Sequence, residues 1–289
     1  MYRNHTVAVV VPAHDEAPFV GTVVAGMPAF VDRIYVVDDA STDGTHNAAL
    51  AAAPSTEGDD AASLGDSDSV ESSRLADRVA TVSHRGRLVL LRHGENRGPG
   101  GAVATGYLAA LSGDADLVVT IDGDGQMDPE ALPRFLDPLV DGEADYATGT
   151  RLRDGTHTTE MPAFRLFGNY LLTLLCRLSS GYWTLTDPVN GYTAATRDAL
   201  TAIDPASSHE GYGYGTETLA RLHADGCRIV DVPHASRYGD EESGIDYRRY
   251  ATRVSMLLLR TFLWRLSRER LGVRDRGSKS PGGEPGWEP

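Results

Sequence analysis

The sequence predicts an α/β protein built on a doubly wound, mainly parallel sheet. Short apolar runs rich in valine alternate with segments suited to helices, as expected for strands that are buried on both faces. Each of the first four runs ends in a cluster of polar residues or glycines. Because ligands of such sheets bind outside the carboxyl ends of the strands, we expect these clusters to meet at one edge.

The elements of the first half follow one another without long gaps, apart from the segment discussed next. The four predicted strands, in chain order, are residues 7–11, 34–37, 88–91 and 117–120. One helix is expected from about Phe19 to Met27, and another opens at the glycine-rich loop and runs through Leu111.

Three segments lie outside this alternation. Residues 54–85 are rich in Ser, Asp and Ala and contain almost no apolar residue before Leu75, so we expect an acidic, disordered insertion in a main domain that spans 1–246. Residues 247–271 are expected to form an amphipathic helix, and residues 272–289 a disordered tail rich in Gly and Pro.

The amphipathic helix allows two interpretations. Arg249, Arg253 and Arg260 fall on one narrow stripe, while apolar residues that include Trp264 cover much of the remainder. Packing on the main domain explains this pattern, and so does a position in a membrane interface. Both interpretations stay open from the sequence.

Composition narrows the class of protein. A net charge of −14 and a pI near 5.0 argue against a nucleic-acid partner. The 26 arginines against a single lysine, with 27 Asp against 14 Glu, are typical of a salt-loving organism. Cys176 and Cys227 are expected to be reduced packing residues of a cytosolic protein. A core strand begins almost at the N-terminus, so no signal peptide is expected, and no apolar run is long enough to span a bilayer.

The fourth strand ends in the sequence Ile-Asp-Gly-Asp-Gly-Gln. Asp122 and Asp124 can turn toward one ligand because glycines follow both, and Gln126 adds an amide oxygen. Oxygen ligands of this kind suit Mg²⁺ or Mn²⁺, which usually share carboxylates with substrate phosphates. We therefore expect a metal–nucleotide site here, in preference to an acidic surface loop.

The glycine-rich loop at 98–101 matches neither common phosphate motif. It has no Gly-Lys-Ser/Thr, and its glycines lack the dinucleotide-binding spacing. Its amides could face a phosphate or ribose, because the loop opens a helix, or it could be a tight packing turn.

Four segments, taken in order, resemble the motifs of family 2 glycosyltransferases with the GT-A fold: Pro12-Ala13-His14-Asp15-Glu16, Val37-Asp38-Asp39-Ala40-Ser41-Thr42-Asp43-Gly44-Thr45, Asn96-Arg97-Gly98 and Asp122-Gly123-Asp124-Gly125-Gln126. The chain most resembles the polyprenyl-phosphate (dolichyl-phosphate) mannosyl- and glucosyltransferases, over about residues 5–240 without the acidic insertion. The resemblance implies a single GT-A catalytic domain, a Rossmann-like sheet flanked by helices.

The resemblance also implies how a nucleotide-sugar donor is held. The nucleotide-sugar set is Pro12, Ala13, His14, Glu16, Asp38, Asp39, Asn96, Gly98, Asp122, Gly123 and Arg237. His14 replaces the usual Tyr, whose place an imidazole can take in stacking on a base, and Asp39 would contact base or ribose. The metal set is Asp122, Asp124 and Gln126. The family's Lys after Asn96 is missing, and the loop after Arg237 lacks the family's Lys.

For the acceptor, the resemblance implies that Arg151 and Arg165, with Asn169 nearby, bind a lipid phosphate. The forked donors of a guanidinium group match phosphate oxygens. The alternative is that both arginines are surface or structural residues. Asp187 and Glu217 are the catalytic candidates. A hydroxyl acceptor would need Asp187 as general base, whereas a phosphate is already an anion and needs none.

The expected activity is therefore inverting transfer of a hexose from UDP-glucose or GDP-mannose, with Mg²⁺ or Mn²⁺, to polyprenyl (dolichyl) phosphate. The enzyme would act as a peripheral protein on the cytoplasmic face of the membrane, in the assembly of cell-surface glycans. The alternative is a family 2 enzyme acting on a sugar hydroxyl, with Asp187 as base. A nucleotidyltransferase is disfavoured because residues 12–16 form no basic glycine-rich loop, and a non-catalytic scaffold because the metal triplet is intact.

Overall fold

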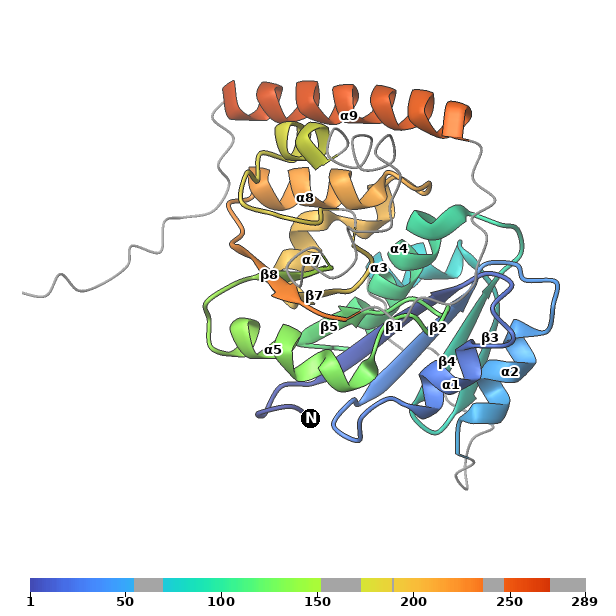
Figure 1. The fold of residues 1–289 in the computed structure, drawn as a ribbon. Helices are drawn as coiled ribbons and strands as arrows, with labels where there is room; N and C mark the ends of the chain where they lie inside the picture. Colours follow the sequence, from blue (N-terminus) through green and yellow to red (C-terminus); the bar gives the residue numbers. More distant parts are fainter. Residues whose placement is uncertain (55–69, 152–172, 189, 236–246, 271–289) are drawn as a thin grey trace, which may run out of the picture.

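The described residues form one mixed sheet of eight strands flanked by helices on both faces (Figure 1). The computed structural model describes residues 1–54, 70–151, 173–188, 190–235 and 247–270. The strand order is β3-β4-β2-β1-β5-β7-β6-β8. The strands are β1 (Val7–Ala13), β2 (Arg33–Asp38), β3 (Val79–Arg85), β4 (Leu88–His93), β5 (Leu117–Thr120), β6 (Tyr146–Thr150), β7 (Thr193–Thr196) and β8 (Ile229–Pro233).

The helices connect these strands and cover the sheet. They are α1 (Val20–Ala25), α2 (Thr45–Ala52), α3 (Val70–Ala76), α4 (Gly98–Ser112), α5 (Leu132–Val140), α7 (Arg197–Ile203), α8 (Tyr214–Ala224) and α9 (Tyr247–Arg270). Short 3-10 helices are η1 (Pro129–Ala131) and η3 (Pro205–Ser207), and residues 173–180 are helical as well.

The alternation of side chains along β1 explains its unbroken apolar run. Val7, Val9 and Val11 pack into a core shared with α1, α2 and α5. Ala8 and Val10 face a second core, which α4, α7 and α8 complete on the opposite side of the sheet. Both faces of the strand are therefore buried from solvent, as expected for a central strand of a parallel sheet.

Two strands run against the others. β4, β2, β1 and β5 are parallel, as the sequence predicts, whereas β3 is antiparallel at one edge. β7 is antiparallel to both β5 and β6, between which it lies, and β8 pairs parallel with β6. The sheet is thus a mainly parallel GT-A-type sheet with one reversed strand inside it.

The expectation that all of residues 54–85 are disordered is wrong for the second half of that segment. Residues 70–76 form α3, anchored by the fully buried Leu75, and residues 79–85 form β3. β3 pairs with β4 alone and its side chains are half-buried or exposed, so the strand needs no apolar run. Residues 55–69 lie outside the described residues.

The predicted C-terminal helix is present as α9. It packs beside α8 and beside the helix at 173–180 (Figure 1). Among the residues that the structure describes, no helix has the length and apolar character needed to cross a membrane. Cys176 and Cys227 are free and buried, as expected of packing residues. The predicted tail lies outside the described residues.

Candidate active site

The ends of β1, β2 and β5 meet at one edge of the sheet through backbone hydrogen bonds. The amide of Gly123 donates to the carbonyl of Pro12 at 3.1 Å, and the amide of Asp39 donates to the carbonyl of Ala13 at 2.9 Å. Three of the polar clusters that the sequence predicts to converge are therefore in direct contact.

Asp39 joins the end of β2 to the loop that opens α4. Its Oδ1 accepts from the amide of Arg97 at 2.8 Å and from Nδ1 of His93 at 2.7 Å, and its Oδ2 accepts from the amide of Gly98 at 2.8 Å. Burial pushes the pKa of Asp39 upward, but the hydrogen bonds outweigh it and hold the pKa below its ordinary value. Asp39 thus positions the loop, and its contact with base or ribose stays a prediction.

Asp38 is fully buried one residue earlier. Its Oδ1 accepts from the amide of Ser41 at 2.8 Å, and Arg92 approaches its Oδ2 to 3.7 Å. Within the described part of the chain, that Oδ2 has no hydrogen-bond partner. Direct contact between Asp38 and a nucleotide likewise stays a prediction.

The glycine-rich loop is a packing turn against the segment that precedes α8. The amide of Gly101 donates to the carbonyl of Glu210 at 3.0 Å. A Cβ on Gly100 would lie on the carbonyl oxygen of His209, and one on Gly98 would come within 2.8 Å of the carbonyl oxygen of Glu210. Of the two interpretations left open by the sequence, the geometry supports close packing.

His14 and Asn96 lie side by side at the rim of this edge. His14 Nδ1 donates to the carbonyl of Asp39 at 2.8 Å, so its Nε2 can accept from the amide group of Asn96 at 3.2 Å. The ring is nearly half exposed, and Glu16 is held beside it through its own amide, which donates to Thr45. An exposed, oriented imidazole is suited to stacking on a nucleotide base.

The metal-binding candidates lie on the turn after β5. Asp124 Oδ1 accepts from the amide of Gln126 at 2.9 Å, which orders the turn. Burial, and next the negative charge of Asp124, raise the pKa of Asp122 to about 7, while Arg151 opposes the shift. Two half-buried carboxylates that repel each other are suited to a cation between them.

Gly191 packs closely against the carboxylate of Asp122. A Cβ at this position would come within 2.5 Å of Asp122 Oδ2, so any residue other than glycine would displace the carboxylate. No group of three or more His, Cys, Asp or Glu side chains in metal-binding geometry occurs among the described residues. A cation here would rely on Asp122, Asp124 and donor phosphates, which is the usual arrangement for Mg²⁺.

A second cluster forms where β6, β7 and β8 meet, around Asp187. Arg151 donates from Nε to Asp187 Oδ2 at 2.9 Å and from Nη2 to Oδ1 at 3.4 Å. Asn190 donates to the same Oδ2 at 3.0 Å and also contacts His234 Nε2 at 3.1 Å. The carboxylate is buried and the guanidinium partly exposed, so Arg151 presents charge at the surface of the cluster.

Sequence reasoning missed two members of this cluster. Asn190 stands inside the motif that contains Asp187, and an amide three residues after a candidate acid was the available signal. His234 belongs to no motif and reaches the cluster only because β8 pairs with β6. Burial lowers the pKa of His234, which favours the neutral ring that accepts from Asn190.

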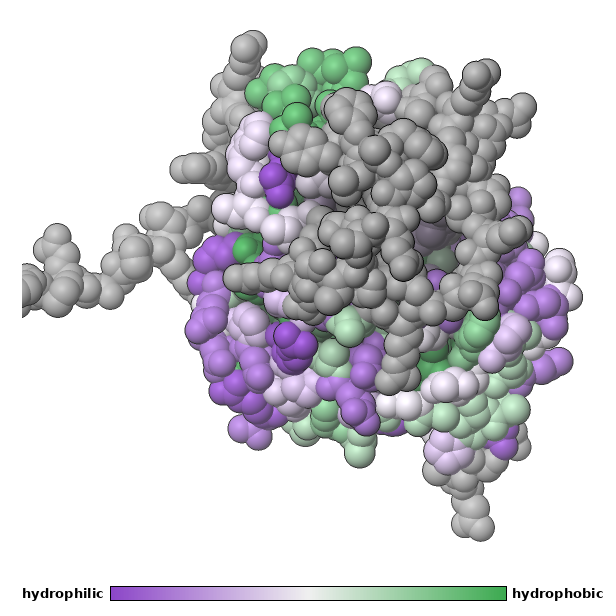
Figure 2. All heavy atoms as spheres, viewed as in Figure 1, coloured by the Kyte–Doolittle hydropathy of each residue, from purple (hydrophilic) through white to green (hydrophobic). Residues whose placement is uncertain are grey.

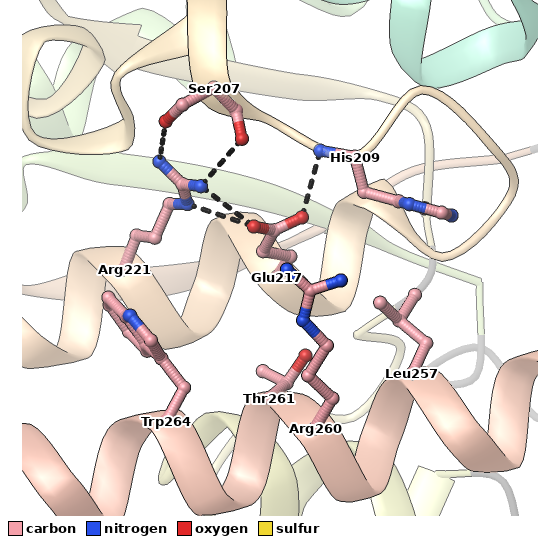
Figure 3. A pocket seen from close by; sticks show the side chains of 8 residues that line it. All are labelled: Ser207, His209, Glu217, Arg221, Leu257, Arg260, Thr261 and Trp264. Carbon is pink, nitrogen blue, oxygen red and sulfur yellow. Dashed lines mark hydrogen bonds and ion pairs between the residues drawn. The ribbon is translucent and has the colours of Figure 1, made fainter.

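Glu217, a predicted catalytic residue, does not belong to either cluster. Its Oε1 accepts from Arg221 at 2.7 Å and its Oε2 accepts from the amide of His209 at 2.8 Å (Figure 3). These contacts place it in a pocket of about 160 Å³ between α8 and α9. Oε1 thus forms an ion pair within α8, and Oε2 holds the helix to the preceding loop, so the geometry favours a structural role, while the catalytic role of Glu217 stays a prediction.

Three predicted site residues lie outside the described residues. They are Arg165, Asn169 and Arg237. Their roles in binding acceptor phosphate and leaving diphosphate stay predictions.

Comparisons with known proteins decide the family. The family described as Glycosyl transferase family 2 matches residues 64–203. An undecaprenyl-phosphate mannosyltransferase of Micrococcus luteus is 31% identical over 201 residues, which cover 69% of this chain and 70% of the relative. The chain is a family 2 glycosyltransferase.

Other relatives of this glycosyltransferase also have names that refer to lipid phosphates. A UDP-N-acetylglucosamine–dolichyl-phosphate N-acetylglucosaminyltransferase of Methanococcus voltae is 28% identical over 53% of this chain. The match spans only 60% of that relative's own length. A dolichyl-phosphate hexose transferase of Haloferax volcanii is 33% identical over 48% of this chain and 58% of its own length.

Solved structures confirm the fold. Glucosyl-3-phosphoglycerate synthase of Mycobacterium tuberculosis superimposes with a TM-score of 0.57 over 91% of this chain and 81% of the synthase, at 20% identity. The same enzyme in complex with Mn²⁺, UDP and phosphoglyceric acid gives a TM-score of 0.58 at 21% identity, over 91% and 78%. The glycosyltransferase therefore has the GT-A fold.

Proposed function

We propose that this glycosyltransferase moves a hexose from a nucleotide-diphosphate sugar to a polyprenyl (dolichyl) phosphate. The observation that carries the proposal is the engagement of Asp187 by Arg151 and Asn190. A hydroxyl acceptor would need a base whose oxygens are free to take its proton. Here one carboxylate oxygen is bound by both partners, and a guanidinium suited to phosphate lies beside it.

The donor would lie across the edge formed by β1, β2 and β5. His14 would stack on the base, with Asn96 fixing its ring, and Pro12, Ala13 and Glu16 would line the same side. When bound at Asp122 and Asp124, with Gln126 nearby, Mg²⁺ or Mn²⁺ would supply positive charge to the departing diphosphate. UDP-glucose and GDP-mannose are the donors we favour.

The acceptor phosphate would approach from the cluster around Asp187. One phosphate oxygen attacks the anomeric carbon as the bond to the donor's diphosphate oxygen breaks, and the nucleoside diphosphate leaves with the bonding electrons. Attack from the opposite face inverts the α-linked sugar to a β-linked product. No proton has to be removed, so Asp187 would orient Arg151 rather than act as a base. The reaction would take place at the inner face of the cell membrane, with the protein bound peripherally.

The test is transfer of radiolabelled sugar to a short-chain polyprenyl phosphate in Mn²⁺ and high salt. UDP-glucose, GDP-mannose and UDP-N-acetylglucosamine would be supplied separately, and label followed into the organic phase. We expect metal-dependent lipid product from one donor. Donor hydrolysis without lipid product from any of the three would refute the acceptor class.

Two variants then separate the roles at the cluster. Arg151→Gln should raise the KM for the lipid phosphate at least about tenfold, because a charged phosphate contact is lost. Asp187→Asn should lower kcat less than the roughly 10²- to 10⁴-fold that loss of a general base causes. Arg228→Gln, which breaks an exposed ion pair with Asp145, is the matched control and should change neither. A loss of 10²-fold or more in Asp187→Asn would favour a sugar-hydroxyl acceptor instead.

A further inference from the structure

The outer face of α9 exposes large apolar side chains that nothing in the described chain covers. Met256, Leu259 and Leu263 are each more than half exposed, and Leu174 and Leu178 of the neighbouring helix at 173–180 are 40% exposed. Figure 2 shows hydrophobic atoms gathered at the top of the molecule, where α9 lies in Figure 1. We call these five residues the apolar face.

The apolar face spans two helices that are fixed to one another. Arg265 of α9 donates to the carbonyls of Ser179 at 3.1 Å and Leu178 at 3.0 Å, and the hydroxyl of Ser179 donates to the carbonyl of Leu258. Both groups of exposed residues repeat at helical spacing, so each forms a stripe along its own helix. These hydrogen bonds hold the two helices that carry the apolar face side by side.

The opposite side of α9 is already occupied by the catalytic domain. Leu257, Thr261 and Trp264 point toward α8 and line the pocket that contains Glu217 (Figure 3). Leu258 is buried as well. Packing on the domain therefore explains one side of the amphipathic pattern and leaves the apolar face unexplained.

The charge of α9 opposes that of the rest of the protein. Its 24 residues contain seven arginines and one glutamate, within a chain whose net charge is −14. Arg260 follows Leu259 in the sequence, is exposed and lines the edge of the pocket that contains Glu217, and the Arg268 guanidinium lies 5.1 Å from the centroid of the Trp264 ring (Figure 3). Positive charge in an acidic protein is thus concentrated on the helix that exposes the apolar side chains.

We propose that the apolar face rests on a lipid bilayer that contains anionic headgroups. Met256, Leu259, Leu263, Leu174 and Leu178 enter the boundary between headgroups and acyl chains, while the exposed Arg260 contacts lipid phosphates. This surface deepens the proposed function and rests on it, because a lipid-linked acceptor is reached only from the membrane. A neutral partner surface would leave the concentrated positive charge without a counterpart.

The test is flotation of the full chain with vesicles. Phosphatidylglycerol–phosphatidylcholine vesicles are compared with pure phosphatidylcholine vesicles, in low and in high salt. We expect the protein to bind the anionic vesicles in low salt. Binding should be weaker but still measurable in high salt, because salt screens the charges and leaves mainly the apolar contact. Leu259→Gln/Leu263→Gln should lower the partition coefficient at least tenfold. Val82→Gln, on the exposed edge strand β3, is the matched control and should bind like the unaltered protein.

Transfer to a short-chain, water-soluble polyprenyl phosphate separates this proposal from the proposed function. The double variant should keep that activity, because both leucines are exposed and distant in sequence from the site residues. If the unaltered protein binds vesicles but transfers no sugar, the proposed function fails and the membrane surface stands. Absence of binding to anionic vesicles, or equal binding by the double variant, would overturn the membrane surface. A dimer in solution that the double variant dissociates, without vesicle binding, would assign the apolar face to a second copy.

Discussion

Replacing Gly191 by Ala should separate metal binding from folding. The added Cβ would lie 2.5 Å from Asp122 Oδ2, whereas ordinary contact begins at 3.4 Å. The backbone of Gly191 lies outside the left-handed region, so alanine causes no conformational strain. The clash is therefore with the end of one side chain, which can rotate away.

The required movement sets the size of the effect. Asp122 Oδ2 must shift by about 0.9 Å, and a misplacement of about 1 Å at a reacting centre can cost roughly 10²-fold in rate. This corresponds to about 2.7 kcal/mol of lost transition-state stabilisation. The free energy of unfolding should change by less than about 1 kcal/mol, because no backbone atom has to move.

The assay is sugar transfer at a series of Mn²⁺ concentrations, with Mn²⁺ affinity measured by calorimetry on the same preparations. We expect Gly191→Ala to bind Mn²⁺ more weakly and to lose about two orders of magnitude in kcat/KM. Gly215→Ala is the matched control, since the nearest atom to its Cβ is the carbonyl oxygen of Pro188 at 3.9 Å. If the two variants have the same Mn²⁺ affinity and the same rate, Asp122 is not the metal ligand inferred here.

Three further predictions concern Asp39, the pocket beneath α9 and the metal site. Asp39→Asn should cost about 2 kcal/mol of stability, since an amide nitrogen would replace an accepting oxygen opposite a backbone amide. The pKa of Asp39 is lower in the folded protein than in the unfolded chain, where it is near 4. The stability that Asp39 contributes is therefore present above pH 4 and is lost as the pH falls through the folded-state pKa. The stability of Asp39→Asn should depend less on pH below about pH 4, as measured by acid denaturation. Glu217→Gln should lower the free energy of unfolding by about 1 kcal/mol, because it weakens the contact with Arg221, and should leave kcat/KM unchanged. A loss of about 10²-fold in kcat would instead support a catalytic role for Glu217. EDTA should abolish transfer and added Mn²⁺ or Mg²⁺ should restore it, whereas transfer that survives EDTA would exclude the metal site.

The parallel half of the sheet could be predicted because burial on both faces leaves a local signature. The unbroken apolar run from Val7 to Val11 predicts a central strand from the sequence alone, and a polar cluster follows where that strand ends. β3 could not be found in this way. It is paired on one side only, its side chains are largely exposed, and its place depends on contacts with β4 rather than on its own composition.

Candidate site residues could be named from the sequence where a motif is contiguous, and not where the fold assembles the contacts. Asp122 and Asp124 stand in one turn, whereas His93 and His234 reach Asp39 and Asn190 across 54 and 44 positions of sequence. Glu217 shows the same limit, because nothing in its neighbourhood in the sequence says that its carboxylate meets Arg221 and the amide of His209. The sequence does not say which side of α8 faces the sheet edge and which faces α9.

Because β7 is antiparallel to β5, the loops on the two sides of this strand pair meet at one edge of the sheet. β5 ends at Thr120, two residues before Asp122, and β7 begins at Thr193, two residues after Gly191. Because Thr120 pairs with Thr193, the antiparallel pairing brings the turn that contains Asp122 next to the loop that contains Asp187. Apart from Arg237, every residue that we propose to hold the nucleotide lies before residue 130, and the cluster around Arg151 and Asp187 lies after it. Acceptor preference can therefore diverge by substitutions in the second half while the first half is retained, provided that Gly191 keeps its contact with Asp122. A chimaera that joins the first half to the second half of a relative with another acceptor should inherit its donor from one parent and its acceptor from the other.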